Sequence, residues 1–389
     1  MKLNIKYVFF SFLTMYLAYS PMLGYSLPVL DDYRKGKQFV HDKLGLDYQV
    51  RIGLLYQDVA PNGKHTAFRD KYEFEFNWAL FESDKYGSGS VQFIYEDINY
   101  PHEQASAIAR RAGILESIND DVNERRFFKR LAYTHQLPGK LQDFSISLGQ
   151  YRIDTFGKTT PDKIPFSYFT NFSLSSNAAR GYPTGGLGGY VTYHPAADLT
   201  IISGLQDTTN YSPQNISAKH INDNRWTSFL YASKVVPLTS KGKTTITGWI
   251  YHSPSVPRPM GQLRAPLAMS NGWVINIRHD IDKWTFFGKW TGSSGNRMSL
   301  KQSNVLNILY HDPFTRNRLD QIGLGFAANQ PSASKHPVRS WEYVAELYWG
   351  WGVDDFLVIT PGIQFYLHPA LTTSHNTATV SSLEFKFIF

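Results

Sequence analysis

From about residue 46 to its end, the chain alternates between apolar and polar residues with a period of two. In "KYEFEFNWAL", residues 71–80, the even positions are large and apolar, whereas Lys71, Glu73, Glu75 and Asn77 occupy odd positions. Successive side chains of a β-strand point to opposite faces, so this period predicts strands with one apolar and one polar face. The polar face carries many charges, which suits a water-filled interior better than a packed core.

The alternation recurs often enough to predict about sixteen strands, most of them about 9–11 residues long. That is the length that a tilted strand needs to cross the hydrocarbon of a bilayer. Trp and Tyr lie near several predicted strand ends, as in the aromatic girdles of membrane barrels; examples are Trp78, Tyr95, Trp273 and Trp349.

The connections between predicted strands alternate between long and short. The long ones are residues 98–126, 153–185, 207–225 and 253–271, and short ones include residues 137–140, 195–197, 280–282 and 350–352. A transmembrane barrel has short periplasmic turns and long extracellular loops, so its loop lengths alternate in this way. In a β-sandwich, by contrast, nothing requires long and short loops to alternate along the chain.

We therefore predict an all-β fold, a transmembrane antiparallel β-barrel of about sixteen strands over residues 46–389. In lipid every backbone polar group must be bonded within the protein, and strands achieve this only in a closed barrel. The closing pair is expected between the last strand and residues 46–57. In the last strand, "SLEFKFIF", Glu384 and Lys386 are expected to face the channel, while the odd-numbered residues face lipid. Phe389 is expected to be recognised by the outer-membrane assembly machinery.

The first 45 residues do not share this pattern. Lys2 and Lys6 precede an apolar run from Tyr7 to Ala18, and Gly24 and Ser26 are small residues near a cleavage site. These features predict a signal peptide over residues 1–26, because the apolar run is too short to span a bilayer as a helix. The charged stretch over residues 27–45 is predicted to form a short periplasmic helix outside the barrel.

Composition narrows the function. The chain has no cysteine, which excludes disulfides and thiolate zinc sites. Its formal charge of +7 is spread along the sequence, and no Lys/Arg block indicates binding to nucleic acid. Neither a Gly-x-Ser-x-Gly elbow nor a His-Glu-x-x-His motif is present, and the His residues are scattered. We therefore expect neither an enzyme nor a bound cofactor or metal.

Several stretches resemble one family of porins. "FVHDKLGLDYQVRIGLLYQD" is similar to a helix leading into a first strand, and "RLAYTHQLPGKLQDFSISLGQYRIDTFG" to a later strand pair. "DQIGLGFAANQPS" and "WEYVAELYWGWGVDDFLVITPGIQFYLHPAL" continue the likeness, the latter with Pro361, Gln364 and Pro369 at signature positions. The chain thus resembles the carbohydrate-selective outer-membrane porins of the OprB family. The resemblance spans nearly the whole mature chain, except for residues 102–126, and is weaker over residues 155–270.

The resemblance implies a sixteen-stranded outer-membrane barrel through which small sugars diffuse passively. An organic-anion porin is the alternative that the positive charge supports, and a surface enzyme or adhesin is a third class. Porins commonly form homotrimers, although no strand in this sequence marks an interface. A sugar channel needs hydrogen-bonding groups that replace hydration without tight binding. The residues predicted to line the pore and contact solute are Arg51, Glu73, Glu75, Gln92, Glu96, Arg130, Arg152, Arg180, Glu342, Glu346 and Gln364.

Two of these expectations depend on irregular structure. Strict alternation from Phe144 places Arg152 on the lipid face, where it would cost about 2–4 kcal/mol, so we expect a bulge near Gly149 to turn it toward the lumen or rim. The glycine-rich connection over residues 153–185 is long enough to fold into the channel, with Tyr168, Asn171 and Arg180 as contacts. The alternative is a loop lying over the extracellular rim. Most of the lumen charges could equally serve only to solvate the wall and brace the barrel.

Overall fold

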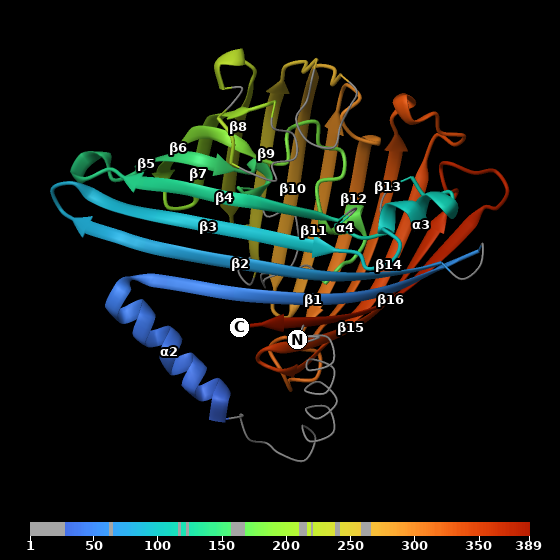
Figure 1. Ribbon diagram of the computed structural model, residues 1–389, viewed down its shortest axis with the longest axis horizontal. Helices are drawn as coiled ribbons and strands as arrows, with labels where there is room; N and C mark the ends of the chain where they lie inside the picture. Colours follow the sequence, from blue (N-terminus) through green and yellow to red (C-terminus); the bar gives the residue numbers. More distant parts are fainter. Residues whose placement is uncertain are drawn as a thin grey trace, which may run out of the picture. The chain divides into compact units, whose positions relative to one another are not determined.

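The computed structural model describes residues 28–61, 65–115, 118–121, 124–156, 168–209, 216–218, 221–237, 242–257 and 266–389. Sixteen antiparallel strands of this part of the chain form one closed barrel (Figure 1). They are β1 (Leu46–Ala60), β2 (His65–Ser83), β3 (Gly87–Asn99), β4 (Arg125–Gln136), β5 (Phe144–Tyr151), β6 (Gly186–Ala196), β7 (Leu199–Asp207), β8 (Trp226–Val236), β9 (Gly242–Ser253), β10 (Ser270–Ile281), β11 (Trp284–Ser293), β12 (Leu300–His311), β13 (Gln321–Pro331), β14 (Glu342–Asp354), β15 (Leu357–Leu367) and β16 (Thr377–Ile388).

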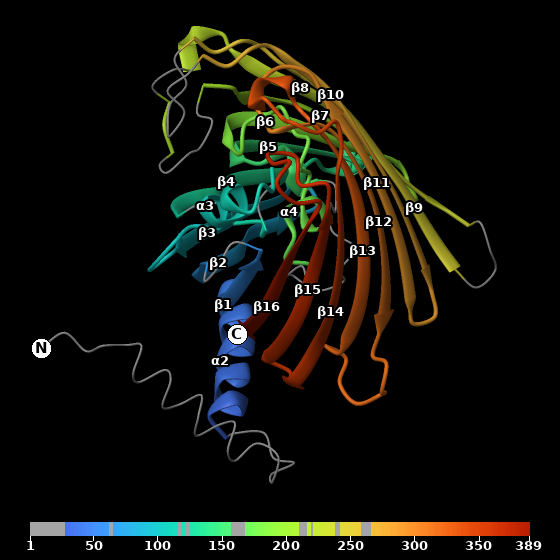
Figure 2. The ribbon, with the colours of Figure 1, turned by 90° about the vertical axis from the view of Figure 1, so that its right-hand side faces the viewer.

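The barrel closes between its first and last strands, as predicted. β1 pairs with β16 in a register that runs from Arg51 opposite Ile388 to Ala60 opposite Thr379. Val50 and Phe389 add a reciprocal pair of backbone hydrogen bonds of 3.0 and 2.8 Å. Every other strand pairs with its sequence neighbours, and a second view shows β1 and β16 side by side (Figure 2). None of the sixteen described strands is therefore left with an unpaired edge, which is the condition for strands in lipid.

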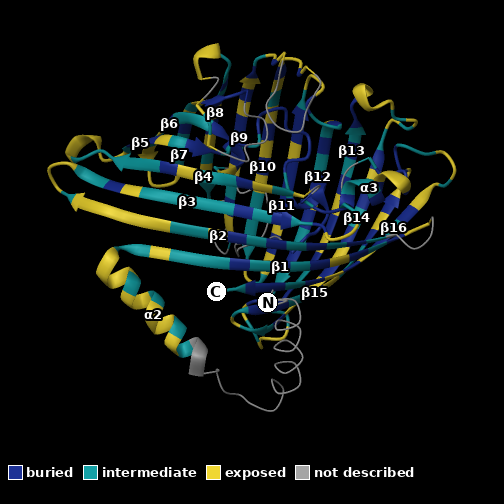
Figure 3. Ribbon diagram, viewed as in Figure 1, coloured by how far each residue is buried: buried dark blue, intermediate teal, exposed yellow. Residues whose placement is uncertain are grey.

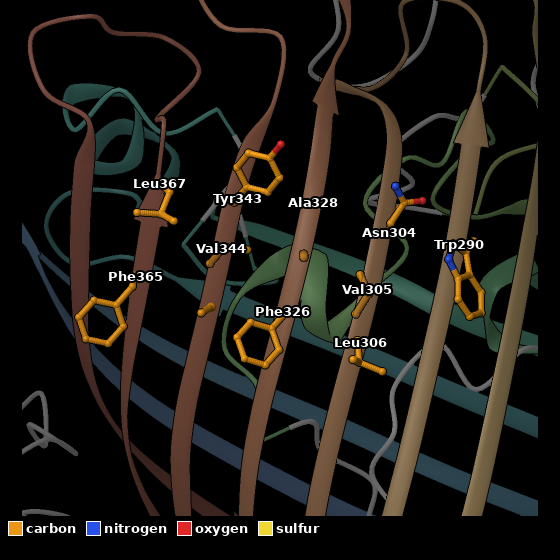
Figure 4. Close-up of a pocket in the computed structure, with 12 residues that line it drawn as sticks. Trp290, Asn304, Val305, Leu306, Phe326, Ala328, Tyr343, Val344, Phe365 and Leu367 are labelled. Atoms are coloured by element: carbon orange, nitrogen blue, oxygen red, sulfur yellow. The ribbon is translucent and has the colours of Figure 1, made fainter.

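Burial follows the period of two (Figure 3). Along β14, Glu342, Val344, Glu346 and Tyr348 are buried within the barrel, while Leu347 between them is exposed on its outer face. A shallow groove of about 520 Å³ on this outer face is apolar, and Figure 4 shows its rings and methyl groups over β11–β15. The lining residues are Trp290, Asn304, Val305, Leu306, Phe326, Ala327, Ala328, Tyr343, Val344, Ala345, Phe365 and Leu367, of which Val305, Ala327 and Val344 are buried and alternate with the more exposed ones. This surface matches the apolar band that a barrel presents to lipid.

One predicted turn was wrong. Residues 350–352 belong to β14, which continues to Asp354. Two neighbouring side chains explain the glycines, because a Cβ at Gly350 would lie 2.9 Å from the Tyr168 ring and one at Gly352 would lie 2.8 Å from the Asn317 amide. These positions therefore need glycine for close packing inside the barrel, and not for a turn.

The N-terminal helix belongs to a compact unit of its own, which ends at Asp47. Helix α2 (Pro28–Leu44) is followed by Gly45, whose φ of 63° suits a helix C-terminus and whose N–H donates to the His41 carbonyl. The predicted signal peptide lies outside the described residues. None of the helices in the described part of the chain is both long and apolar enough to span a membrane.

Candidate functional site in the barrel lumen

A first chain segment, residues 168–185, folds into the barrel. Its short helix α4 (Phe172–Ser175) contacts β12 and β13 and lies within the ring of strands in Figures 1 and 2. The Tyr168 hydroxyl donates to the Leu319 carbonyl, 2.8 Å, at the end with short connections. Farther along, the Gly181 N–H donates to the Tyr251 hydroxyl, 2.7 Å, near the opposite end. This inner segment therefore crosses the barrel interior and does not lie over the rim.

Two buried charged side chains hold the inner segment by hydrogen bonds to its backbone. The Glu346 carboxylate accepts from Thr170 N and Oγ1, both at 2.8 Å, and from Asn171 N at 2.9 Å. Lys289 Nζ donates to the Ser173 carbonyl at 2.9 Å and to the Ser176 carbonyl. The carboxylate thus bonds N–H groups before α4 and the ammonium bonds carbonyls at its end, which complements the helix dipole.

A second segment also enters the lumen, from the stretch that the sequence left unassigned. It follows helix α3 (Ala105–Arg111), and the Ile118 carbonyl accepts hydrogen bonds from Gln57, 3.0 Å, and Gln364, 2.9 Å. Asp121 bonds Arg69 and Lys71. Burial would raise the pKa of Asp121, but Lys71 and Arg69 together lower it below its usual value. The carboxylate is therefore held in its charged form.

A continuous ion-pair network covers the inner wall of β1–β4 and β16. Arg51 binds both Glu73 and Glu75, and Lys129 links Glu73 to Glu96. Among the described residues this network joins six cations to six carboxylates, so it is formally neutral. Its cations are Arg51, Arg69, Lys71, Arg125, Lys129 and Lys386, and its carboxylates are Glu73, Glu75, Glu96, Asp120, Asp121 and Glu384.

A charged triad, Arg152–Asp154–Arg180, lies beyond the end of β5. Asp154 accepts from Arg152 Nη2 at 2.7 Å and from Arg180 Nη1 at 2.8 Å. Burial would raise the pKa of Asp154, but the two guanidinium groups lower it. Arg152 is turned inward, 5.9 Å above the Phe127 ring, although strand pairing passes through Gly149 without a register shift. The predicted bulge at Gly149 is therefore absent, and Arg152 turns inward because it follows the last residue of β5.

The bulge lies in β4 instead. Opposite it, the register shifts between Ile94 and Tyr95, so that consecutive residues Lys129 and Arg130 both point inward. Lys129 bonds Glu73 and Glu96, whereas Arg130 donates to the Tyr190 hydroxyl. Strict alternation predicted that Arg130 faces the lumen, but it could not predict that the neighbouring Lys129 does so too.

The predicted solute-contacting residues separate into three groups by their exposure. Glu342, Glu346 and Gln364 are fully buried and bond the inserted segments; Glu342 accepts from Leu115 N and Ala370 N, both at 2.9 Å. Glu96 is also fully buried, within the ion-pair network. Those still partly exposed in the lumen are Glu75, Gln92, Arg130 and Arg152. Arg51, Glu73 and Arg180 are almost covered, at 6–8% exposure. The uncovered wall therefore lies along β2–β6.

Sequence reasoning missed Arg69, Lys129, Arg125 and Asp121. Arg69 occupies an odd-numbered position, as Lys71 and Glu73 do, and therefore faces the lumen with them. Extending the predicted strand toward its actual start at His65 would have identified Arg69 as a lumen residue. Asp121 and Arg125 belong to the stretch around the second inserted segment, which carries no periodic signal.

Comparisons with known proteins agree with this architecture. The model of the family "Carbohydrate-selective porin, OprB family" matches residues 104–389. Porin AaxA of Chlamydia pneumoniae is 27% identical over 351 residues, which cover 88% of this chain and 78% of the relative. The high-pH structure of OprB of Pseudomonas putida superimposes with a TM-score of 0.75 and 14% identity, covering 92% of this chain and 97% of that one. A trimer form of OmpT of Vibrio cholerae gives a TM-score of 0.52 with 8% identity, covering 88% of this chain and 99% of that one. With its closed barrel and inserted segments, the chain belongs to the OprB family of carbohydrate-selective porins and is a channel of the outer membrane.

Proposed function

We propose that the protein lets small sugars diffuse passively through the lumen along the β2–β6 wall. The observation that carries this proposal is the neutral network, in which six cations and six carboxylates of the described residues satisfy one another. This network presents many hydrogen-bond donors and acceptors and adds little net charge of its own. A neutral polyol can exchange hydration for these groups without being bound tightly.

The inner segment supports selection by size. Residues 168–185 cover the wall from β11 to β15 and so occupy part of the barrel cross-section. A solute can pass only through the part that remains open. The residues that remain as proposed solute contacts on the other wall are Glu75, Gln92, Arg130 and Arg152. Glu342, Glu346 and Gln364 instead set the position of the inserted segments.

Liposome swelling tests this function. Vesicles that contain the purified barrel should swell faster in glucose than in raffinose, and faster in glucose than in an amino acid of similar size. Equal rates for glucose and the amino acid would contradict carbohydrate selectivity. Replacing Arg51 by Ala removes the cation that pairs with Glu75 and one of the two that pair with Glu73, so the glucose rate relative to the amino acid should change. Arg318→Ala is the matched control, because Arg318 is exposed in the connection after β12.

We propose that the barrel assembles as a homotrimer in outer-membrane lipid. A trimer form is described for OmpT of Vibrio cholerae, whose fold this barrel shares. Phe389 is the proposed contact for the assembly machinery, because it ends the strand that closes the barrel. Chemical cross-linking of the detergent-extracted protein should give a trimer band, and a monomer at all cross-linker concentrations would contradict this assembly.

A further inference from the structure

Arg130 differs from the other arginines of the described strands. Arg51, Arg69, Arg125, Arg126 and Arg278 each have a carboxylate within 4.0 Å, and Arg130 has none. Its Nη2 donates to the Tyr190 hydroxyl, and its Nε is buried without a hydrogen-bond partner. Among the described residues, therefore, no carboxylate neutralises this guanidinium by direct contact.

Arg130 is also held in a defined place. It lies near the middle of β4, opposite Ile94, and remains partly exposed in the lumen. Its guanidinium carbon is 5.9 Å from the centre of the Tyr190 ring. That ring packs edge-to-face on Tyr151 and Phe156, at centroid distances of 4.9 and 4.6 Å. A guanidinium whose partner is fixed in this way loses little freedom when it binds a solute.

The surplus positive charge of this wall is concentrated at two places. The ion-pair network of β1–β4 and β16 is formally neutral, whereas the Arg152–Asp154–Arg180 triad has two cations for one carboxylate. Arg130 adds a second uncompensated charge at mid-depth. A solute that passes along β2–β6 therefore meets a positive field in a channel otherwise lined with paired hydrogen-bonding groups.

We propose that Arg130 and Tyr190 form a weak binding subsite for the carboxylate of a small sugar acid, such as an aldonate or a uronate. This inference rests on the proposed sugar function, because the neutral network would bind the hydroxyl groups of the same solute. Guanidinium and carboxylate match in geometry and charge, and the Tyr190 hydroxyl orients the guanidinium. The lumen water around Arg130 keeps the interaction weak enough for release, which conduction requires.

The experiment uses full-length protein in planar bilayers and in liposomes. A gradient of sodium glucuronate gives a zero-current potential, from which the permeability of glucuronate relative to sodium is obtained. Radiolabelled glucose influx is measured on the same preparations. Arg130→Gln should lower the ratio of glucuronate to glucose permeability by about fivefold, the factor that corresponds to about 1 kcal/mol. Arg126→Gln is the matched control, because Arg126 is 65% exposed and pairs with Asp97 on the other face of β4.

The outcomes separate the subsite from the general function. The subsite is supported if the ratio of glucuronate to glucose permeability is lower in Arg130→Gln than in wild type and unchanged in Arg126→Gln. An unchanged ratio in Arg130→Gln overturns it, and so does an equal fall of both permeabilities, which would indicate a structural role. If wild-type protein admits glucose but does not favour glucuronate, the subsite is wrong and the sugar function stands. If wild-type protein admits glucuronate and excludes glucose, the sugar function fails and the anion subsite stands.

Discussion

Glu346 offers a direct test of how the inner segment is held. Replacing it by Gln keeps the size of the side chain and removes its charge. The carboxylate accepts three hydrogen bonds, two from Thr170 and one from Asn171. An amide has a single oxygen, and its NH₂ group would face a backbone N–H group that also donates. At least one buried N–H of the inner segment then loses its acceptor.

The magnitude follows from these bonds. A buried donor left without a partner costs about 1–3 kcal/mol. Other contacts persist in the variant: Gln364 donates to Thr170 Oγ1, Asn329 donates to Ser173 Oγ, and Lys289 still bonds the Ser173 carbonyl. The segment should therefore remain mostly in place. A loss of about 2 kcal/mol would nevertheless raise the population of displaced states about 30-fold.

Single-channel recording measures this change. Glu346→Gln should show more current noise and more frequent openings of larger conductance, and raffinose influx should rise by a larger factor than glucose influx. Glu82→Gln is the matched control, because Glu82 is exposed near the end of β2 that faces the short turns. The heat-dependent shift of the folded barrel on gels shows that both variants assemble. Wild-type conductance, noise and raffinose exclusion in an assembled Glu346→Gln barrel would refute the proposed role of this carboxylate.

Two further predictions concern the Arg152–Asp154–Arg180 triad and the pairing of β1 with β16 that closes the barrel. Because Arg152 and Arg180 lower the pKa of Asp154 against the effect of burial, its charge is present above about pH 4, the usual value, and is lost as pH falls through the lowered pKa. The triad then gains net positive charge, so the zero-current potential should shift toward anion preference below pH 4. Asp154→Asn should show that preference already at pH 7. If the zero-current potentials of wild type and Asp154→Asn are equal at every pH, the prediction is wrong. Deleting Phe389 removes both backbone bonds to Val50 and the ring contacts with Phe387 and Phe356, so less barrel should assemble on a heat-modifiability gel, whereas the barrels that do form should keep wild-type conductance.

The alternation of side chains was sufficient to predict the barrel. From Tyr72 to Trp78 the apolar residues occupy one face, and the structure places Lys71 and Glu73 on the other, inside the barrel. The closing pair was also predictable, because a last strand with Leu383 and Phe385 on one face and Glu384 and Lys386 on the other fits only between lipid and lumen. This signal is strong because a strand in lipid must keep one apolar face along its whole length.

Local irregularities limited the prediction of single residues. The bulge opposite Ile94 and Tyr95 turns both Lys129 and Arg130 inward, and a bulge has no fixed sequence signature. Arg152 turns inward by following the end of β5, at a point that periodicity alone does not locate. An error of one residue in such places moves a side chain between lumen and lipid.

The alternation of apolar and polar residues along each strand depends on the local sequence alone. It determined which residues can face the lumen. Which of these residues a solute can reach depends on what covers them, and contacts between distant residues decide that. Glu346 and Gln364 occupy the same alternating positions as any lumen residue, yet they bond Thr170, which lies 176 and 194 positions earlier in the chain. Asp121 reaches Arg69 and Lys71 from a stretch with no periodicity. Backbone pairing is satisfied strand by strand, whereas buried charges need partners from wherever the folded chain brings them.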